Sequence, residues 1–325
     1  MYRSSNASPY GFRIVGSCQN ERRLVDWRTA FAAYSQCDPR AECEREAYLS
    51  AFGFGDAFRD HLNATGSTRG YVGECWSAWL WFDIDREGDM ESATHDARRL
   101  ASALVDRFAI AGDELLVFYS GSKGFHVGLP TSLWNPAPST SFAATCRRFA
   151  ESVASAASVA IDSGVYDRVR AFRSPNSRHA KTGRYKRWLS LHELLNLRPE
   201  RIVSIAAEPE PFDIPEPPAV DANAVRLWRD AAMDIDQQRI ANADRRSTGQ
   251  RSTLNRTTLD FIRDGASNGE RHRLLFSAAA NLAEYGCSFD LAMALLGEAA
   301  LDSGLSPSEV RRQIECGLRH CKGAP

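Results

Sequence analysis

Three short apolar segments in the middle of the chain constrain its fold more than any other feature. Residues 78–85 (AWLWFDID) and 115–120 (LLVFYS) are continuous runs rich in aromatic and β-branched side chains, and residues 125–130 (FHVGLP) alternate. Runs of this length and composition are typical of strands. Residues 93–109 and 141–157 instead carry apolar side chains at three- and four-residue intervals, which predicts helices. The sequence therefore predicts an α/β or α+β layer.

The segments on either side of this layer have different patterns. Apolar side chains in residues 24–63 recur every three or four positions, which predicts two or three helices. Between Val203 and Val225 there is no Lys or Arg, and five acidic residues alternate with five prolines. Because such a composition cannot build a packed core, this stretch is either a stiff, extended linker or a segment laid over the surface.

The last part of the chain has the pattern of a helical bundle. Residues 268–320 predict three helices, with Ser288 as the N-cap of the second. Ser306 and Glu309 form a capping box, with a proline at the first helical position, at the start of the third. We therefore expect three regions along the chain: a large domain over residues 1–205, a connecting segment over 206–250 and a helical domain over 251–325.

Bulk properties limit the partners of the protein without identifying them. The formal net charge is −1, so a nucleic-acid surface has to come from local clusters of Lys and Arg. Neither an apolar signal segment nor a run of roughly 18 apolar residues is present, which predicts a soluble, cytoplasmic protein without membrane contact. The eight cysteines are irregularly spaced, so we expect reduced thiols and no structural zinc.

Two aspartates at the end of the first strand form the first candidate site. Asp83 and Asp85 are two residues apart, so their carboxylates point to the same face of the sheet. They would lie about 7 Å apart along the strand and repel each other without a cation between them. Magnesium takes oxygen ligands, often one or two carboxylates together with substrate phosphates. The pair is therefore a candidate metal site, although two acids taken alone favour the alternative of a solvated strand end.

The connection between the second and third strands has the composition of a phosphate-binding loop. Residues 120–127 (SGSKGFHV) contain the hydroxyls of Ser120 and Ser122, the amine of Lys123 and the imidazole of His126. Glycines let the backbone approach a ligand, while hydroxyl and amide groups donate to phosphate oxygens. The spacing is not that of a Walker loop, because no GxxxxGK[ST] pattern and no following helix is present. The alternative is a glycine hairpin with a half-buried histidine.

A third acidic position precedes a strongly basic segment. Asp162 follows the apolar VAI, and from Asp162 to Arg187 there are eight Lys or Arg against two Asp, a local charge of about +6. Basic side chains interspersed with aromatic ones suit a polyphosphate or a nucleic-acid backbone, whereas a solvated basic face is the alternative. The candidate contacts with DNA are Arg168, Arg170, Arg184 and Lys186.

Together, these three segments resemble the motifs of the archaeo-eukaryotic primase superfamily. The matching elements are DxD at a strand end, SGxKGxH in the following hairpin, and a later hydrophobic-Asp leading into RxPxSxHxKTG, over roughly residues 75–190. The motif sequences are similar to those of the small catalytic primase subunit and of phage or plasmid primase-polymerases. The C-terminal segment is more loosely similar to the PriCT-like helical domain of mobile-element primases. The resemblance implies an RRM-like mixed sheet flanked by helices, plus a small all-α bundle.

The resemblance also implies an activity and a role for each motif residue. It implies a DNA primase or primase-polymerase, which makes primers on single-stranded DNA from NTPs or dNTPs by two-metal nucleotidyl transfer during replication. Two Mg²⁺ or Mn²⁺ ions would be needed and no organic cofactor, and a separately encoded helicase would be a partner. The catalytic metal ligands would be Asp83, Asp85 and Asp162. The triphosphate contacts would be Ser120, Ser122, Lys123, His126, Arg173, Ser177, His179 and Lys181.

Three other interpretations stay open at this point. The polymerase domain of bacterial end-joining ligases shares an SGSKG-like hairpin and a DxD, but the helical C-terminal segment favours priming. A metal-dependent nuclease can also be built from acidic residues, histidine and lysine. A non-catalytic replication initiator could bind origin DNA through the basic segment alone. Motif spacing does not distinguish ribose from deoxyribose substrates.

Overall fold

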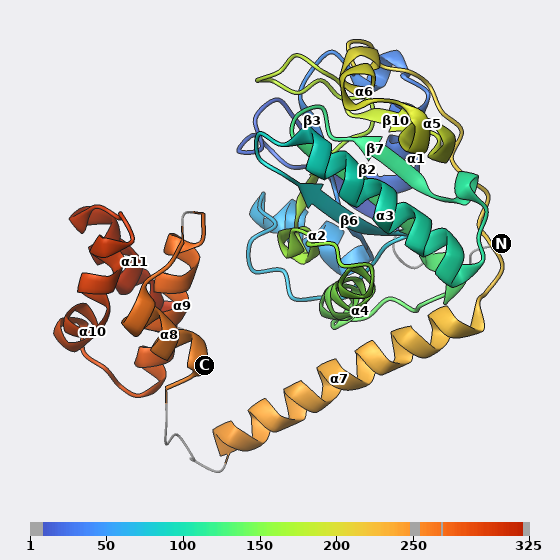
Figure 1. Ribbon diagram of the computed structural model, residues 1–325. Helices are drawn as coiled ribbons and strands as arrows, with labels where there is room; N and C mark the ends of the chain where they lie inside the picture. Colours follow the sequence, from blue (N-terminus) through green and yellow to red (C-terminus); the bar gives the residue numbers. More distant parts are fainter. Residues whose placement is uncertain (1–8, 248–253, 268, 321–325) are drawn as a thin grey trace. The chain divides into compact units, whose positions relative to one another are not determined.

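The computed structural model describes residues 9–247, 254–267 and 269–320 (Figure 1). The chain divides into two compact units, Met1–Gln237 (unit 1) and Gln238–Pro325 (unit 2), and the division falls inside the long helix α7, Ala222–Ser247. Unit 1 combines antiparallel sheets with helices, which makes it an α+β structure. Within the described residues, no helix is both long and apolar enough to cross a membrane.

The predicted strands form one antiparallel sheet, called sheet B. It has the strand order β10-β7-β8-β6. The predicted strands at residues 78–85, 115–120 and 125–130 are confirmed within one residue. The bounds are β6 Trp79–Asp85, β7 Leu116–Tyr119, β8 Gly124–Pro130 and β10 Arg187–Leu189. All four strands are joined by antiparallel pairing, so side chains that are direct cross-strand partners share a face.

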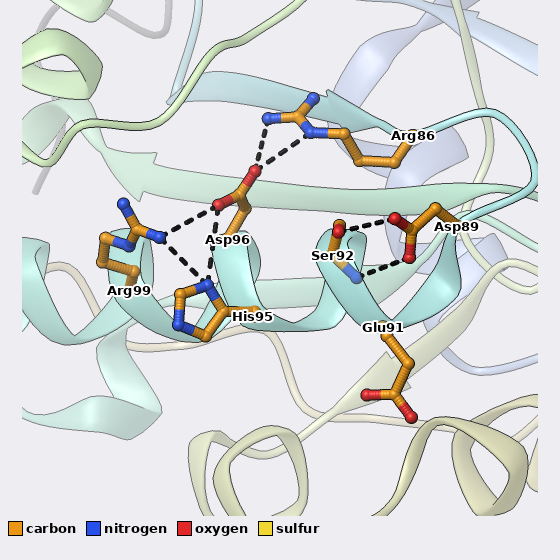
Figure 2. Close-up of a pocket in the computed structure, with 7 residues that line it drawn as sticks. All are labelled: Arg86, Asp89, Glu91, Ser92, His95, Asp96 and Arg99. Atoms are coloured by element: carbon orange, nitrogen blue, oxygen red, sulfur yellow. Dashed lines mark hydrogen bonds and ion pairs between the residues drawn. The ribbon is translucent and has the colours of Figure 1, made fainter.

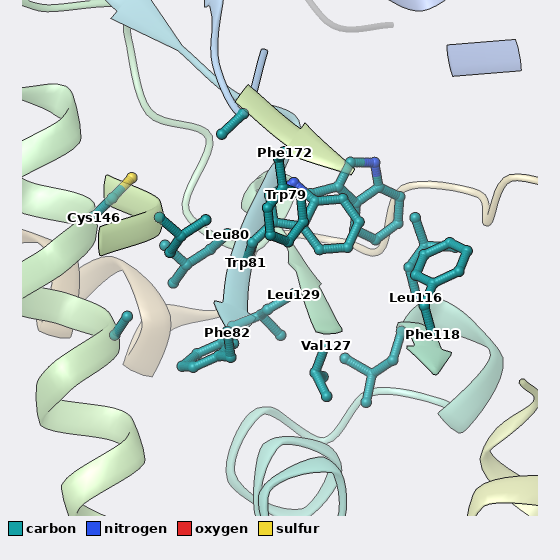
Figure 3. Packing of buried hydrophobic residues seen from close by; sticks show 14 of the residues in the cluster. Trp79, Leu80, Trp81, Phe82, Leu116, Phe118, Val127, Leu129, Cys146 and Phe172 are labelled. Atoms are coloured by element: carbon teal, nitrogen blue, oxygen red, sulfur yellow. The ribbon is translucent and has the colours of Figure 1, made fainter. Parts of the chain in front are cut away.

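The two faces of sheet B contact different layers. Helix α3, Met90–Phe108, lies across one face, and α4, Phe142–Ala156, packs beside β6; both helices were predicted (Figure 1). On the opposite face, Trp81 packs against Phe172 with 5.4 Å between ring centroids (Figure 3). Because side chains alternate along a strand, Asp83 shares the face of Trp81 and is directed away from the α3 layer.

A second sheet, called sheet A, comes from segments scattered along the chain. In the described part it has six strands in the order β5-β4-β1-β3-β9, with β2 paired to β1. The bounds are β1 Tyr10–Val15, β2 Arg23–Asp26, β3 Ala47–Ser50, β4 Gly53–Phe54, β5 Cys75–Trp76 and β9 Ala171–Arg173. Its last strand, β9, pairs with β3 across more than a hundred residues of sequence.

The helical prediction for residues 24–63 is right in part. Two helices occur there, α1 Trp27–Ser35 and α2 Asp56–Thr65, but strands β2, β3 and β4 lie in the same region. These strands contain two to four residues each; β2 pairs locally with β1, whereas β3 and β4 pair with segments farther away in the sequence. Strands this short are below the length at which periodicity separates a strand from a helix.

The acidic, proline-rich stretch runs over the surface of unit 1. After α5, Leu191–Asn196, and α6, Pro199–Ile205, the fully described residues 206–221 form no helix or strand. Phe212 is nevertheless buried, and its amide donates to the carbonyl of Ser35 at 2.9 Å. The region 222–247, which the sequence placed in a connecting segment, is instead the helix α7.

Unit 2 is a bundle of short helices, and its three predicted helices are confirmed. The bounds are α8 Arg256–Asp264, α9 Arg271–Glu284, α10 Phe289–Asp302 and α11 Pro307–His320. Only α8 was not predicted. Ser288 caps α10 by accepting from the amide of Leu291 at 3.3 Å, and Ser306 and Glu309 form the capping box of α11.

Short 3₁₀ turns connect several elements of unit 1. They are η2 Pro39–Ala41, η3 Gly112–Glu114, η4 Thr131–Leu133 and η5 Ser163–Tyr166. The last of these follows Asp162 and begins at the exposed end of β6, where the aspartates lie.

Candidate active site

Asp83 and His126 are direct partners across strands β6 and β8, on the face of sheet B that is turned toward β9. His126 Nε2 lies 3.5 Å from Asp83 Oδ1. Asp83 is only 9% exposed, and its Oδ1 has no hydrogen-bond partner among the described residues. Burial, followed by the negative charges of Asp85 and Asp162, raises the pKa of Asp83 to about 7. The site therefore contains a buried carboxylate that needs positive charge or a donor.

The third predicted carboxylate lies beside the same strand end. The amide of Asp162 donates to the carbonyl of Asp83 at 2.8 Å, which attaches the start of η5 to β6. The Asp162 side chain is exposed and accepts from the amide of Gly164 at 2.8 Å. This backbone contact explains how Asp162, far away in the sequence, contributes negative charge at Asp83.

The glycine hairpin brings a lysine to the second aspartate. Lys123 Nζ lies 3.3 Å from Asp85 Oδ2, and nearly half of the lysine side chain is exposed. Gly124 is the direct partner of Asp85, and a Cβ there would lie 1.9 Å from the carbonyl oxygen of Ile84. Glycine is therefore required for the hairpin to approach β6 this closely, as the sequence pattern suggested.

The two hairpin serines are used inside the hairpin itself. Ser120 Oγ accepts from the amide of Gly124 at 3.3 Å and is 7% exposed. Ser122 is half-buried, and its carbonyl accepts from the hydroxyl of Tyr119 at 2.9 Å. The structure thus places both serines next to Lys123, with Ser122 the more accessible of the two.

His126 is an uncharged side chain in this environment. Burial lowers its pKa well below the usual value, and the positive charges of Lys186 and Arg173 lower it further. The ring packs against Phe172 in a tilted arrangement with 4.3 Å between centroids, and Nδ1 is buried without a partner in the described part of the chain. A neutral imidazole can donate or accept one hydrogen bond at each nitrogen but cannot supply a positive charge to a phosphate.

Arg173, at the end of β9, contacts residues near β3 of sheet A and acts electrostatically on His126. Its Nη2 contacts Glu46 Oε1 at 3.2 Å and the hydroxyl of Tyr48 at 3.3 Å, both from the region of β3. Its Nη1 is buried and unpartnered among the residues that the structure describes. Arg173 is also close enough to His126 to lower the pKa of that histidine. Sequence analysis missed Glu46 and Tyr48, because no local pattern shows that β3 and β9 pair.

The remaining candidate residues of the RxPxSxHxKTG segment, residues 173–183, occupy both exposed and buried positions. Lys181 is exposed, and its amide donates to His179 Nδ1 at 3.2 Å. Ser177 was predicted to contact the triphosphate, but it is 0% exposed and its hydroxyl donates to the carbonyl of Ser174 at 2.8 Å. In this structure the Ser177 hydroxyl holds the loop and does not face solvent.

The predicted DNA contacts also differ in accessibility. Arg170 is exposed and lies close enough to Asp83 to interact electrostatically with it. Arg168 and Arg184 are half-buried, and each donates to a backbone carbonyl. Lys186 is 1% exposed, so the prediction that it contacts DNA is not supported. A buried ammonium cannot reach a phosphate on the surface without rearrangement of the fold.

The donor set fits hard divalent cations, although its side chains do not converge here. Among the described residues, no three His, Cys, Asp or Glu side chains are placed to hold a metal ion. The Asp85 carboxylate instead lies beside Lys123. Carboxylate oxygens are nevertheless the ligands that Mg²⁺ and Mn²⁺ prefer, and the unpartnered Oδ1 of Asp83 is the kind of orphaned buried atom that a cation would satisfy.

A separate polar cavity lies along the start of α3. It has a volume of about 530 Å³ and is lined by Arg86, Asp89, Glu91, Ser92, His95, Asp96 and Arg99 (Figure 2). Asp96 lies between Arg86, at 2.5 Å, and Arg99, at 3.5 Å. None of the predicted site residues lines this cavity, and its arginines are already paired with protein groups, so we assign it no role.

Comparisons with known proteins add little to this geometry. No protein-family model matches the chain, and no curated protein does. A solved structure described as "Crystal structure of primase RepB'" aligns with 99% of this chain and 98% of that chain, at 13% sequence identity and a TM-score of 0.37. A TM-score this low carries no argument about fold or function. The class that the structure itself defines is an α+β protein with a buried acidic site beside a glycine hairpin.

Proposed function

We propose that unit 1 is a template-directed nucleotidyl transferase with an archaeo-eukaryotic primase core, which makes primers on single-stranded DNA. The observation that carries this proposal is the meeting of three separate motif segments at one strand end. His126 lies 3.5 Å from Asp83, Lys123 lies 3.3 Å from Asp85, and the amide of Asp162 donates to Asp83. Segments that resemble the superfamily motifs in their order and in their residues thus also lie close together in the fold.

The balance of charge at the site supports nucleotidyl transfer. Asp83, Asp85 and Asp162 would hold two divalent ions, Mg²⁺ or Mn²⁺. Two such ions would favour ionisation of the attacking 3′-hydroxyl and neutralise the leaving pyrophosphate. Burial, and after it the repulsion from Asp85 and Asp162, raises the pKa of Asp83, so the charged form of this carboxylate is unfavourable here. A site that is unfavourable when empty of cations is typical of one built to bind them.

The basic residues around the acidic centre suit a triphosphate. Lys123 is nearly half exposed, so its amine can turn from Asp85 to a phosphate oxygen. Arg173 has a buried Nη1 that is unpartnered in the described part of the chain. His126 is neutral and would contribute a hydrogen bond, not charge. His179, Lys181 and Ser122 remain proposed contacts at the rim of the site.

The partners follow from the same chemistry. Single-stranded DNA would be the template, and NTPs or dNTPs the substrates, with Arg170 as an exposed basic residue that interacts electrostatically with Asp83. A helicase would be supplied by a separate chain, and the protein would act in the cytoplasm. We also propose that the helices of unit 2 hold the template or the initiating nucleotide, since a primase positions two nucleotides without a primer.

A priming assay tests this function. Wild type and the double variant Asp83→Asn, Asp85→Asn are incubated with unprimed single-stranded DNA, labelled NTPs or dNTPs, and Mg²⁺ or Mn²⁺. The matched control is Asp106→Asn, Asp113→Asn, which changes two exposed aspartates outside the site. Short products that disappear only in the site variant support priming. Extension that needs a supplied primer indicates a repair-type polymerase, shortened template indicates a nuclease, and DNA binding without any product indicates a non-catalytic protein.

A further inference from the structure

Lys186 is a fully buried lysine between the two sheets of unit 1. It precedes β10, is 1% exposed, and its ammonium is surrounded by three aromatic rings. Its Nζ lies 5.1 Å from the ring centroid of Trp81, 4.8 Å from that of Phe118 and 4.3 Å from that of Phe172. Trp81 and Phe118 belong to sheet B, whereas Phe172 belongs to β9 of sheet A. Burying an ammonium costs roughly several kcal/mol of free energy, and cation–π contacts offset only part of this cost.

The ammonium makes one contact that links the site segments directly. Lys186 Nζ donates to the carbonyl of Arg173 at 2.8 Å. The backbone of Lys186 also pairs with the same loop, since its amide donates to the carbonyl of Ser177 at 3.0 Å and its carbonyl accepts from the amide of Asn176 at 2.9 Å. The loop between Arg173 and Lys186 is therefore closed at its base by side-chain and backbone bonds.

Lys186 is connected in this way to two side chains that are proposed to bind the ligand, Arg173 and His126. The Lys186 ammonium holds the carbonyl of Arg173, whose guanidinium faces Glu46 and Tyr48. It also lies over Phe172, the ring against which His126 packs at 4.3 Å between centroids. Burial lowers the pKa of Lys186 well below its usual value, and the negative charge of Asp83 opposes this shift by favouring the charged ammonium. One buried cation thus contacts or influences Arg173, His126 and the acidic centre.

We propose that Lys186 is a positioning residue of the candidate active site: its buried ammonium clamps β9 against sheet B and thereby holds Arg173 and Phe172 beside His126. The effect on a nucleotide rests on the proposed function, whereas the clamp itself does not. A role in positioning explains why a charge is retained in an aromatic environment where methionine would pack at lower cost.

Two substitutions separate the parts of this clamp, and a third controls for stability. Lys186→Met keeps the length of the side chain without its charge or hydrogen bond, and Lys186→Gln keeps a donor for the Arg173 carbonyl. Arg98→Met removes a comparable cation that donates to the backbone carbonyls of Leu194 and Leu197, from α3 on the other face of sheet B. Each full-length variant is examined by hydrogen exchange and by calorimetric binding of ATP or dATP with Mg²⁺.

We expect Lys186→Met to speed exchange at the amides of residues 174–186 and to weaken nucleotide binding about tenfold, which corresponds to about 1.4 kcal/mol. Lys186→Gln should recover part of both effects. Arg98→Met should speed exchange near residues 194–197 and leave nucleotide binding unchanged.

Several outcomes would overturn the clamp. One is that Lys186→Met exchanges its amides at the wild-type rate or binds nucleotide as well as wild type does. The others are that Lys186→Gln behaves like Lys186→Met, or that Arg98→Met loses as much nucleotide binding as Lys186→Met. If the wild-type chain binds no nucleotide, the proposed function fails. The exchange data then still decide whether Lys186 holds β9 in place.

Discussion

His126 lies 3.5 Å from Asp83 across β8 and β6, and each of the two residues is less than a tenth exposed. At this distance the pair does not form a normal hydrogen bond. Asp83 Oδ1 and His126 Nδ1 are both unpartnered among the described residues. Each unmet buried polar group costs about 1–3 kcal/mol, so the pair destabilises the fold in its ligand-free form. Such a cost is understandable where a ligand supplies the missing contacts.

Replacing the buried carboxylate should therefore stabilise the metal-free protein while abolishing its activity. Asp83→Asn removes a charge that is destabilised first by burial and then by repulsion from Asp85 and Asp162, so we expect its free energy of unfolding at pH 8 in EDTA to exceed that of wild type. The gain should be on the order of a few kcal/mol, because each unit of pKa shift corresponds to about 1.4 kcal/mol. Urea unfolding measures the free energy of both proteins, and a variant less stable than wild type would contradict the prediction that the Asp83 charge destabilises the fold.

The stability of the metal-free protein should also depend on pH through Asp83. A carboxyl group whose pKa is higher in the folded state weakens folding once it ionises. Because the pKa of Asp83 rises from 3.8 to about 7, the penalty is absent at low pH, grows between these two values and is complete above them. We expect the thermal midpoint to fall across this window in wild type and to fall less in Asp83→Asn, as followed by calorimetry in EDTA.

The close approach of the hairpin to β6 gives a test of the site's geometry. Gly124→Ala would place a methyl group 1.9 Å from the carbonyl oxygen of Ile84, so β8 has to move away from β6. We expect a loss of roughly 1–3 kcal/mol in stability, together with lost activity. The control is Gly297→Ala in α10, whose added Cβ would meet Met293 Cε at an ordinary 3.6 Å. A Gly124→Ala protein of unchanged stability would show that the hairpin is not held this closely.

Ser177 distinguishes a structural serine from a ligand-binding one. Because its hydroxyl is buried and bonded within the loop, Ser177→Ala should lower the free energy of unfolding by about 1 kcal/mol. Its effect on nucleotide affinity should be small compared with that of Arg173→Met. Titration calorimetry with ATP or dATP and Mg²⁺ compares the two variants, and equal losses of affinity would support the ligand role predicted for Ser177.

The capping box of α11 should contribute measurably to unit 2. Ser306→Ala removes the hydroxyl that accepts from the amide of Glu309, and the expected cost is about 1 kcal/mol. Ser267→Ala, at an exposed position before α9, is the control. Loss of helical circular dichroism in urea follows the change, and equal midpoints for the two variants would mean that the cap does not stabilise the helix.

Local patterns in the sequence were enough to locate the central elements. Strands β6 to β8 and helices α3 and α4 are long enough for their composition and periodicity to be recognised. The same holds for the capped helices of unit 2, since an N-cap depends on residues three positions apart. The strand-end position of Asp83 and Asp85, and the glycine requirement of the hairpin, follow from equally local features.

Only the tertiary structure decided which polar residues are exposed and what they contact. Sheet A joins short strands from distant parts of the chain, and no local pattern predicts that β3 brings Glu46 and Tyr48 to Arg173. Lys186 and Ser177 have the residue types of a ligand-binding loop, yet both are buried. Residue type determines the chemistry that a side chain can perform, whereas its burial and partners depend on non-local packing of the sheets.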